Sequence, residues 1–370
     1  MKIAIVINTS WNIYNFRMGF IKALQKAGHE VHTIAPVDKY TSYLTDAGCI
    51  HHSMRMDRRG ANPLKDLALT SELFLIYKRV KPDVILHYTI KPNIYGTFAS
   101  ALLGIPVINN VCGLGTVFLK RNFASATAMV LYKIAFLFPK KVFFQNPDDL
   151  NLFVNKKLVS KSRTDLLPGS GVDLNEFRPA KFKRNTHFTF LMISRLIIDK
   201  GVLEYIKAIE NLREKGIDAR FQLLGSADPD HKRGIQLDTI AEWINNGTVE
   251  YLGTTANVIP NIVNADCIVL PSYREGTPRA LLEAAGCAKP IVATDVPGCR
   301  QVVVNNYNGL LCNSKDANDL ADKMENILSM KDKQLKQFGK NGRRHVEKEF
   351  DQNIVIEKYF TAIDGLRQAS

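Results

Sequence analysis

Short apolar runs alternate with amphipathic helical patterns along most of this 370-residue chain. The runs end in polar or turn residues, and runs separated by helices indicate a parallel sheet covered by helices on both faces. In the first half, strands are expected near Ile3–Ile7, Val31–Ala35, Val84–His87, Pro106–Asn109 and Val142–Gln145. The helical patterns between them lie near Phe16–Lys26, Pro63–Val80, Asn93–Leu103 and Phe123–Phe138.

The same alternation begins again after Pro179, with strands expected near Phe188–Ile193, Ala219–Leu224, Val249–Leu252, Cys267–Leu270 and Ile291–Thr294. Between the two series, one proline and two glycines within residues 167–173 favour a hinge. We therefore predict an α/β chain of two doubly wound, Rossmann-like domains that face a cleft. Residues 1–176 would form the first domain and residues 177–350 the second. A last helix in residues 351–370 would pack back on the first domain.

Positive charge is concentrated in the first half of the chain. Residues 1–176 carry 22 Lys and Arg against 12 Asp and Glu, whereas the remainder carries 27 against 24. A basic half favours an anionic partner. No zinc finger, recognition helix or RNA-binding aromatic motif accompanies the charge, so nucleic acid is not expected. An anionic membrane surface that carries a diphosphate-linked acceptor is the better candidate.

Neither a secretory signal nor a membrane-spanning run is evident. The first residues read as a strand, and no run of eighteen apolar residues occurs. The six cysteines are scattered without a paired or metal-type spacing, which favours reduced, structural thiols. These features predict a cytoplasmic protein.

Two carboxylates lie eight residues apart, across an expected strand-to-helix junction in the second domain. Glu275 would lie in the loop before the helix, and Glu283 about one turn inside it. Pro278 suits the first helical position. Because helical side chains lean toward the helix N-terminus, both carboxylates can approach one pocket at the carboxyl end of the strand. Free backbone N–H groups there suit a phosphate, and the carboxylates suit sugar hydroxyls.

Two cations, Arg195 and Lys200, lie between the first strand of the second domain and the next helix. A diphosphate leaving group develops negative charge as its bond to the sugar breaks, and two fixed cations neutralise that charge. On their own they could equally be solvated surface residues. Their occurrence in one domain with the two glutamates favours a nucleotide-sugar site.

The combination of these motifs resembles the family 4 retaining glycosyltransferases of the GT-B fold, and the resemblance covers nearly the whole chain. Its closest likeness is to bacterial enzymes that extend capsule, O-antigen or lipid-linked glycans. The residues that carry it are Arg195 with Lys200, Pro271-Ser272, Glu275-Gly276-Thr277-Pro278, Glu283, residues 293–298, residues 308–311, residues 169–173, residues 90–93 and residues 113–115.

This resemblance implies that residues 1–176 form the acceptor-binding domain and residues 177–350 the nucleotide-sugar-binding domain, and it also implies the donor contacts. Arg195 and Lys200 would hold the donor diphosphate, and Glu275 would contact hydroxyls of the donor sugar, beside the backbone of Gly276, Thr277 and Pro278. Glu283 would bind the nucleotide ribose. No cofactor beyond a UDP-linked sugar and no metal is expected, because the carboxylate pair Asp228 and Asp230 lies in a turn-forming sequence.

Candidate acceptor residues lie in the first domain. Ser10 and Trp11 follow the first strand where many relatives have paired glycines, and Arg17 is the candidate for an acceptor diphosphate. Its alternative is a solvated helix arginine. His87 ends a strand where relatives carry an active-site histidine, although a structural histidine is equally expected. Thr89 or Lys91 would then take the functional place.

The segment 123–138 is apolar nearly all round, with Lys120 and Arg121 before it and Lys140 and Lys141 after it. Buried packing is the default for such a helix. Basic flanks also suit a helix that rests on anionic lipid.

We therefore predict a peripherally membrane-associated retaining glycosyltransferase. It would move a hexose or N-acetylhexosamine from a nucleotide sugar to a lipid-linked glycan in surface polysaccharide or glycan biosynthesis. The alternatives are a nucleotide-sugar epimerase of the same architecture and a non-catalytic protein that binds anionic glycolipids.

Overall fold

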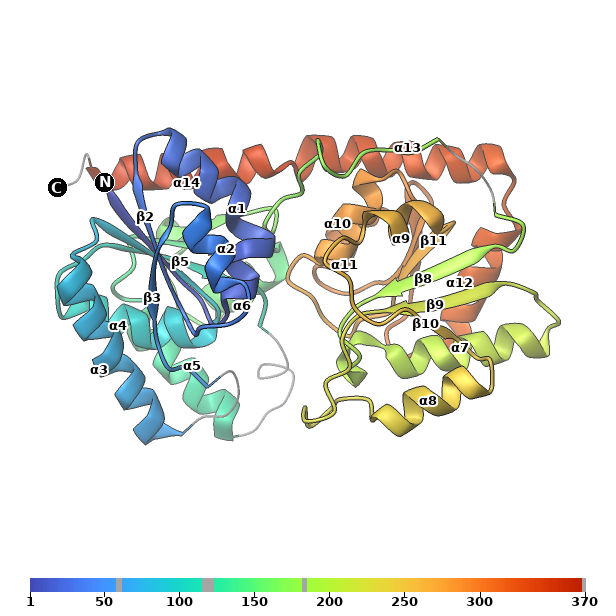
Figure 1. Cartoon of the computed structure of the whole chain (residues 1–370), viewed down its shortest axis with the longest axis horizontal. Helices are drawn as coiled ribbons and strands as arrows, with labels where there is room; N and C mark the ends of the chain where they lie inside the picture. Colours follow the sequence, from blue (N-terminus) through green and yellow to red (C-terminus); the bar gives the residue numbers. More distant parts are fainter. Residues whose placement is uncertain (58–61, 115–122, 182–184, 368–370) are drawn as a thin grey trace. The chain divides into compact units, whose positions relative to one another are not determined.

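The computed structural model describes residues 1–57, 62–114, 123–181 and 185–367. Gly115, Lys120 and Arg121, which the sequence analysis uses, lie outside these ranges. The chain divides into two compact units. Unit 1 comprises Met1–Ser170 and Gln352–Ser370, and unit 2 comprises Gly171–Asp351 (Figure 1). The division therefore falls after Ser170, whereas the sequence analysis places it after residue 176.

Unit 1 contains a parallel seven-stranded sheet in the order β3-β2-β1-β4-β5-β6-β7. Its strands are β1 (Lys2–Val6), β2 (Glu30–Ala35), β3 (Ile50–Ser53), β4 (Val84–Tyr88), β5 (Val107–Val111), β6 (Lys141–Phe144) and β7 (Thr164–Leu166). Its helices are α1 (Ser10–Lys26), α2 (Thr41–Asp46), α3 (Pro63–Val80), the π-helix η1 (Pro92–Gly96), α4 (Thr97–Ala101), α5 (Phe123–Ala135), α6 (Pro147–Asn155), the 3₁₀-helix η3 (Lys161–Arg163) and α14 (Gln352–Arg367).

Strand β1 shows why the apolar runs are continuous. Ile3 and Ile5 belong to the core that includes α1 and α14, while Ala4 and Val6 belong to the core that includes α3. Successive strand side chains point to opposite faces, so a sheet buried on both faces needs apolar residues at every position.

Helix α14 brings the end of the chain back to unit 1, and Figure 1 shows it in red beside the blue helix α1. Tyr359 of α14 stacks on Phe20 with ring centroids 4.7 Å apart, and it accepts a hydrogen bond of 2.7 Å from Asn110. The last helix is therefore part of the core of unit 1 and not an appendage.

Unit 2 contains a parallel six-stranded sheet in the order β10-β9-β8-β11-β12-β13. Its strands are β8 (Thr189–Ile193), β9 (Arg220–Leu224), β10 (Glu250–Tyr251), β11 (Cys267–Leu270), β12 (Ile291–Thr294) and β13 (Gly309–Cys312). Its helices are the 3₁₀-helix η4 (Ile198–Lys200), α7 (Val202–Glu214), α8 (Leu237–Asn245), α9 (Ile259–Asn264), α10 (Arg279–Gly286), α11 (Cys299–Val302), α12 (Ala317–Ser329) and α13 (Asp332–Glu349).

Both sheets have the strand order of doubly wound folds, in which the order reverses once. The reversal lies between β1 and β4 in unit 1 and between β8 and β11 in unit 2. Open parallel sheets bind ligands at the carboxyl ends of the strands at this point.

The predicted α/β class with two Rossmann-like domains is correct, although three strands were missed: β3, β7 and β13. Helix α1 begins at Ser10 and not near Phe16, because Thr9 caps it by accepting a hydrogen bond from the backbone of Asn12 at 3.0 Å. Across the described residues, no helix combines the length and the apolar character needed to cross a membrane.

Gly201 brings the connection after β8 against the end of β11. Its φ is +75°, and a Cβ atom there would lie 2.0 Å from the carbonyl oxygen of Pro271. Only glycine permits both the left-handed conformation and this approach of two backbones.

A matched pair of substitutions tests this close approach, because Gly216 also has a φ of +75° but nothing within 4 Å of an added Cβ. Gly216→Ala should lower the free energy of unfolding of unit 2 by about 1–2 kcal/mol, the cost of a left-handed alanine. Gly201→Ala should lower it by about 1–3 kcal/mol more through overpacking. Urea unfolding followed by Trp243 fluorescence in a Trp11→Phe background reports on unit 2. Equal losses in the two variants would contradict the proposed contact.

Candidate functional site

The two strands that flank the reversal in unit 2 carry the two motifs singled out in the sequence. Arg195 and Lys200 follow β8, and Glu275 follows β11. The hydrogen bond of 3.0 Å from the backbone of Tyr273 to the carbonyl of Asp199 joins the two connections directly. Residues far apart in sequence therefore meet at the carboxyl edge of the sheet.

Glu275 is held by partners from both connections. Its Oε1 forms an ion pair with Nζ of Lys200 and accepts a hydrogen bond of 2.7 Å from Oγ of Ser272. The side chains of Lys200 and Glu275 are 22% and 11% exposed, so the pair is only partly screened by water. The resemblance includes Ser272 without a role, and the sequence analysis missed that Ser272 helps to hold Glu275.

The loop after β12 fixes the backbone of this cluster. Glu275 donates a backbone hydrogen bond of 3.1 Å to the carbonyl of Pro297. Gly298 has a φ of +88°, and a Cβ atom there would lie 2.6 Å from the carbonyl oxygen of Gly276. Gly298 therefore permits the backbones of residues 275–276 and 297–298 to touch.

Arg195 differs from Lys200 in its surroundings. Its side chain is exposed, and it makes no ion pair within the part of the chain that the structure describes. An exposed guanidinium at the carboxyl end of β8 is available to an anionic ligand, whereas the ammonium of Lys200 must share its charge with Glu275.

Glu283 has a different partner from Glu275. Its Oε1 lies 2.7 Å from Nε of Arg279, which also donates a hydrogen bond of 2.9 Å to the carbonyl of Gly171. Burial raises the pKa of the Glu283 carboxyl, while Arg279 opposes that rise. Glu275 thus binds Lys200, whereas Glu283 binds Arg279. That the two carboxylates share one pocket stays a prediction.

The backbone between the carboxylates is close to the predicted arrangement. Helix α10 begins at Arg279, and Pro278 is the residue before it and not its first residue. Gly276 and Pro278 are buried, whereas Thr277 is half-buried. Thr277 and Gly276 each make contacts in the structure.

Ser10 and Trp11 follow the carboxyl end of β1 in unit 1, and they differ in burial. Ser10 is fully buried; its Oγ donates to the carbonyl of Pro36 at 3.0 Å and accepts from Thr41 at 3.1 Å. Trp11 is 43% exposed and packs edge-on against Phe16. Trp11 is therefore accessible to an acceptor, whereas Ser10 ties α1 to the loop after β2.

Arg17 is buried and is not the solvated helix arginine of the alternative. It is 6% exposed, and its guanidinium lies 4.6 Å from the ring centroid of Tyr88. Nη1 donates to the carbonyl of Phe16 at 3.0 Å, but Nε has no hydrogen-bond partner. No carboxylate pairs with it among residues that the structure describes. A buried cation without a counter-ion is costly, which suits a site that receives an anion.

His87 lies inside a fully buried polar network. Its Nε2 accepts from the hydroxyl of Tyr77 at 2.9 Å, and its Nδ1 donates to Oδ1 of Asn109 at 3.0 Å. A Cβ atom at Gly96 would lie 2.6 Å from Nε2, so the π-helix η1 closes over the ring. Burial lowers the pKa of His87 to about 3. The histidine is neutral and occupied on both nitrogens, which favours the structural reading.

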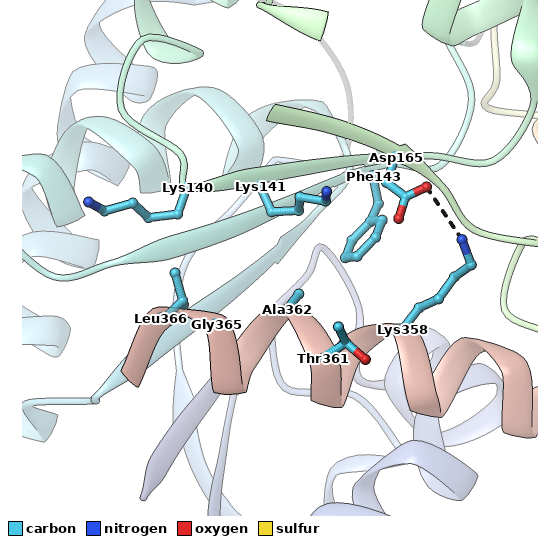
Figure 2. Close-up of a pocket in the computed structure, with 9 residues that line it drawn as sticks. All are labelled: Lys140, Lys141, Phe143, Asp165, Lys358, Thr361, Ala362, Gly365 and Leu366. Atoms are coloured by element: carbon cyan, nitrogen blue, oxygen red, sulfur yellow. Dashed lines mark hydrogen bonds and ion pairs between the residues drawn. The ribbon is translucent and has the colours of Figure 1, made fainter. Parts of the chain in front are cut away.

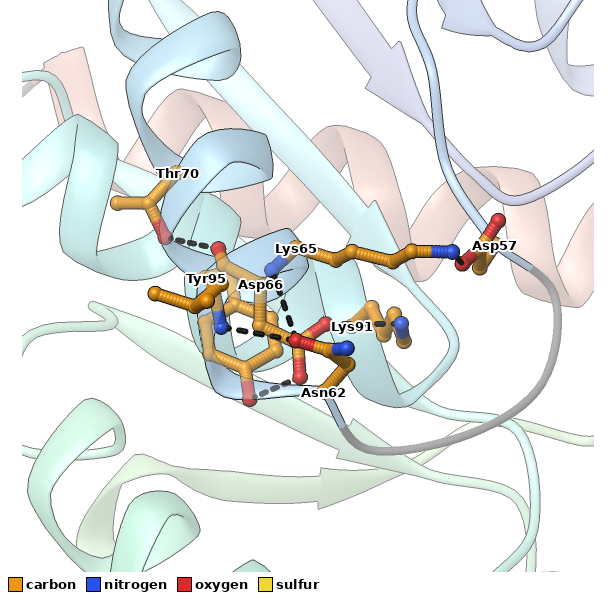
Figure 3. A network of polar contacts seen from close by, with 8 residues as sticks. Asp57, Asn62, Lys65, Asp66, Thr70, Lys91 and Tyr95 are labelled. Atoms are coloured by element: carbon orange, nitrogen blue, oxygen red, sulfur yellow. Dashed lines mark hydrogen bonds and ion pairs between the residues drawn. The ribbon is translucent and has the colours of Figure 1, made fainter.

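Lys91 is anchored by a carboxylate that the sequence analysis did not single out (Figure 3). Its Nζ lies 2.8 Å from Oδ1 of Asp66, and Tyr95 donates to Oδ2 of the same carboxylate at 2.9 Å. The side chains of Asp66 and Lys91 are 5% and 17% exposed. Asp66 lies in the first turn of a separate helix, α3, 25 residues before Lys91. No local pattern in the sequence therefore links the two residues.

Thr89 is the most strained residue at this edge. It follows β4 directly and has a φ of +66°, which is unusual for a β-branched residue, and its buried Oγ1 has no hydrogen-bond partner. Strain and unsatisfied polar atoms cluster at functional sites, so Thr89 fits the alternative to His87. Throughout the described ranges, no group of three or more His, Cys, Asp or Glu residues is placed to hold a metal ion.

Two doubly wound sheets, with cations and carboxylates after the strands that flank the reversal of one of them, suit a protein that binds a nucleotide. Two family models match the chain: glycosyl transferases group 1 over residues 173–345 and glycosyl transferase 4-like over residues 2–146. The chain belongs to this glycosyltransferase family and is a glycosyltransferase of the GT-B fold. These matches give no support to the epimerase or to the non-catalytic alternative.

Relatives of known activity match over most of their length. The chain is 31% identical to an N,N'-diacetylbacillosaminyl-diphospho-undecaprenol α-1,3-N-acetylgalactosaminyltransferase of Campylobacter jejuni, covering 98% of each chain. It is 28% identical to a UDP-Gal:α-D-GlcNAc-diphosphoundecaprenol α-1,3-galactosyltransferase of Escherichia coli, covering 80% of this chain and 78% of the relative.

Solved structures share the fold at lower identity. Sucrose-phosphate synthase of Thermosynechococcus elongatus has a TM-score of 0.82 at 19% identity, with full coverage of both chains. HepE of Anabaena in complex with UDP and glucose has a TM-score of 0.81 at 17% identity, covering 98% of this chain and 99% of that chain.

The buried pair of Asp66 and Lys91 makes a prediction about stability. Asp66→Asn should lower the free energy of unfolding of unit 1 by about 3–5 kcal/mol, because it leaves a buried ammonium unpaired. Asp57→Asn is the control, since Asp57 pairs with Lys65 at 2.8 Å on the exposed surface nearby (Figure 3). The control should leave stability nearly unchanged. Urea unfolding followed by Trp11 fluorescence in a Trp243→Phe background measures both; similar losses would show that Lys91 does not depend on Asp66.

The buried neutral His87 predicts a pH dependence. The folded chain binds a proton at His87 only near pH 3, whereas the unfolded chain binds it near the ordinary value of 6.5. Stability from this group is therefore complete above pH 6.5 and is lost as the pH falls toward 3. Between pH 7 and pH 5 the loss should be about 2 kcal/mol. His87→Gln should lack this part of the loss, whereas His187→Gln, at an exposed position, should retain it. A decrease in His87→Gln as large as in the parent chain would refute the assignment.

Proposed function

We propose that this glycosyltransferase moves a hexose or N-acetylhexosamine from a UDP-linked donor to a lipid-diphosphate-linked glycan, with retention at the anomeric carbon. The named activities of the two relatives support the acceptor class and the sugar class. A similar structure that binds UDP and glucose supports the nucleotide. Such a reaction belongs to surface polysaccharide or glycan biosynthesis.

The observation that carries this proposal is the cluster of Arg195, Lys200 and Glu275 at the strand reversal of unit 2. Arg195 and Lys200 would receive the charge that develops on the donor diphosphate as the bond to the sugar breaks. Glu275, fixed by Lys200 and Ser272, would accept hydrogen bonds from hydroxyls of the donor sugar, beside the backbone of residues 276–278. Glu283, oriented by Arg279, would accept hydrogen bonds from the ribose.

Retention would proceed through a short-lived, oxocarbenium-like ion pair. The departing phosphate would then take the proton of the incoming hydroxyl on the same face of the sugar. In unit 1, Trp11 offers an exposed ring for the acceptor, Arg17 an uncompensated charge for its diphosphate, and Thr89 and Lys91 polar groups at the end of β4.

Helix α5 supports peripheral association with the inner face of the cytoplasmic membrane. Val130, Ile134 and Leu137 lie on one side of this segment and are 58%, 46% and 65% exposed. Lys133 and Lys140 lie beside them and are exposed. The helix is therefore only partly buried, and an apolar stripe with basic neighbours suits an anionic lipid surface.

Substitution of the two cations tests the donor assignment. Arg195→Ala and Lys200→Ala should each lower kcat by about 100-fold or more, because each removes a fixed charge that faces a developing anion. The matched control is Lys207→Ala, on the exposed surface of α7 in the same unit, and it should leave kcat unchanged. Transfer from UDP-N-acetylgalactosamine or UDP-galactose to a synthetic undecaprenyl-diphosphate sugar provides the assay. Control-like rates in both cation variants would overturn the donor site.

A further inference from the structure

A basic cavity of about 410 Å³ lies in unit 1, on the side of the sheet that α14 covers (Figure 2). Lys140 and Lys141 border it at the start of β6, and Lys358 borders it from α14. Asp165 of β7 is the acidic residue in its wall. Three lysines and one aspartate thus line the cavity, so its lining carries an excess of positive charge.

The charges in this cavity are only weakly neutralised. Nζ of Lys358 lies 3.3 Å from Oδ1 of Asp165, but these side chains are 36% and 41% exposed. Exposed pairs of this kind contribute little to stability, so Lys358 can exchange its partner for a stronger anion. Lys140 and Lys141 form no ion pair with any residue that the structure describes.

The cavity also has an apolar side and free space. Phe143, Ala362 and Leu366 contribute to its wall. Gly365 lines it too, and a Cβ atom added there would meet nothing within 4 Å. Figure 2 shows Lys141 and Lys358 extending toward Asp165, while Lys140 lies toward the opposite end. A ligand with an anionic head and an apolar part matches this lining.

The location separates this cavity from the proposed acceptor site. Lys141 is the first residue of β6, whereas Trp11 and Thr89 follow the carboxyl ends of β1 and β4. All strands of this sheet are parallel, so the two sets of residues lie at opposite edges. Occupation of the cavity therefore does not compete with transfer.

The exposed stripe of α5 leads directly to this cavity. Leu137 and Phe138 are 65% and 49% exposed and precede Lys140 in the chain. The carbonyl of Leu137 accepts a hydrogen bond of 2.5 Å from Arg163, which follows Lys161 in η3. These apolar side chains are thus followed by Lys140 and lie next to Arg163, the order in which a bilayer presents acyl chains and phosphates.

We propose that the cavity bordered by Lys141, Lys358 and Asp165 binds the phosphate group of an anionic ligand. Such a phosphate occurs both in a phospholipid head group and in a soluble phosphate ester. The lipid source rests on the membrane association proposed above, whereas the site itself does not. Lys141 and Lys358 donate to the phosphate oxygens, and Asp165 holds Lys358 in place until the phosphate arrives.

The test compares two double variants of the full chain that remove equal charge from unit 1. Lys141→Gln with Lys358→Gln empties the cavity of its converging ammonium groups. Lys22→Gln with Lys26→Gln removes two exposed lysines from α1 and is the control. Co-sedimentation with phosphatidylglycerol and phosphatidylcholine vesicles measures the lipid arm. The cavity variant should bind about 25-fold more weakly, about fivefold for each lysine lost at an anionic surface. The control should change binding by less than about threefold.

A third variant separates a built site from diffuse attraction. Gly365→Leu keeps every lysine and places a side chain in the wall of the cavity, so it should also weaken vesicle binding. The soluble arm is titration with sn-glycerol 3-phosphate, followed by the shift in thermal unfolding. If sn-glycerol 3-phosphate raises the unfolding temperature of the parent chain but not of the cavity variant, the site binds a soluble phosphate ester. If only vesicle binding is weakened in the cavity variant, the site binds a phospholipid head group. Equal behaviour of the cavity and control variants in both arms overturns the proposal.

Transfer to a water-soluble acceptor analogue distinguishes this proposal from the catalytic one. All three variants should retain the kcat of the parent chain in that assay, because none of the changed residues lies at the carboxyl edge of either sheet. A loss of kcat in the cavity variant, but not in the control, would contradict the separation of the two sites.

Discussion

The contact between Lys200 and Glu275 is the interaction that connects the two motifs of unit 2. It joins the connection after β8 to the connection after β11, the two strands between which the sheet reverses its order. Next to this pair, Gly201 lets the first connection touch Pro271, and Gly298 lets the loop after β12 touch the backbone of Gly276. Two glycines in left-handed conformations therefore permit the backbone contacts beside the ion pair. The pair leaves Glu275 with a fixed orientation and leaves Lys200 partly neutralised, whereas Arg195 forms no ion pair with any of the described residues.

Unit 1 uses the same topology with a different distribution of charge. Its carboxyl edge contains a neutral histidine sealed by Tyr77 and Asn109, and a lysine paired with the buried Asp66. Arg17 is the exception, because it is buried over Tyr88 without a carboxylate among the described residues. Burial of one uncompensated guanidinium is tolerated when a ligand supplies the missing charge. In the proposed function the two units would therefore bind anionic groups in different ways: unit 2 with an exposed arginine and a shared lysine, and unit 1 with one enclosed arginine.

The basic residues of unit 1 lie in more than one place. Arg17 lies at the carboxyl edge of the sheet, whereas Lys140, Lys141 and Lys358 border a cavity at the opposite end. The exposed apolar stripe of α5 ends next to that cavity. If the acceptor is tethered to a lipid, as proposed, membrane attachment and sugar transfer would then occupy different surfaces of unit 1.

Periodicity in the sequence was enough to identify α3, β11 and β12 to the residue, since their apolar patterns and flanking turn residues are local properties. Strand β3 was missed because Ile50-His51-His52-Ser53 contains a single apolar residue, and it joins the sheet only through pairing with β2. The candidate site likewise depends partly on local sequence and partly on tertiary structure. The sequence by itself determined that two cations and two carboxylates follow strands of one domain. The pair of Arg279 and Glu283 is also local, because the two residues lie four positions apart in α10. Only the tertiary structure decided that Lys200 pairs with Glu275 and Lys91 with Asp66. Pairing across loops depends on which strands become neighbours and how closely their backbones approach, and no local pattern encodes either.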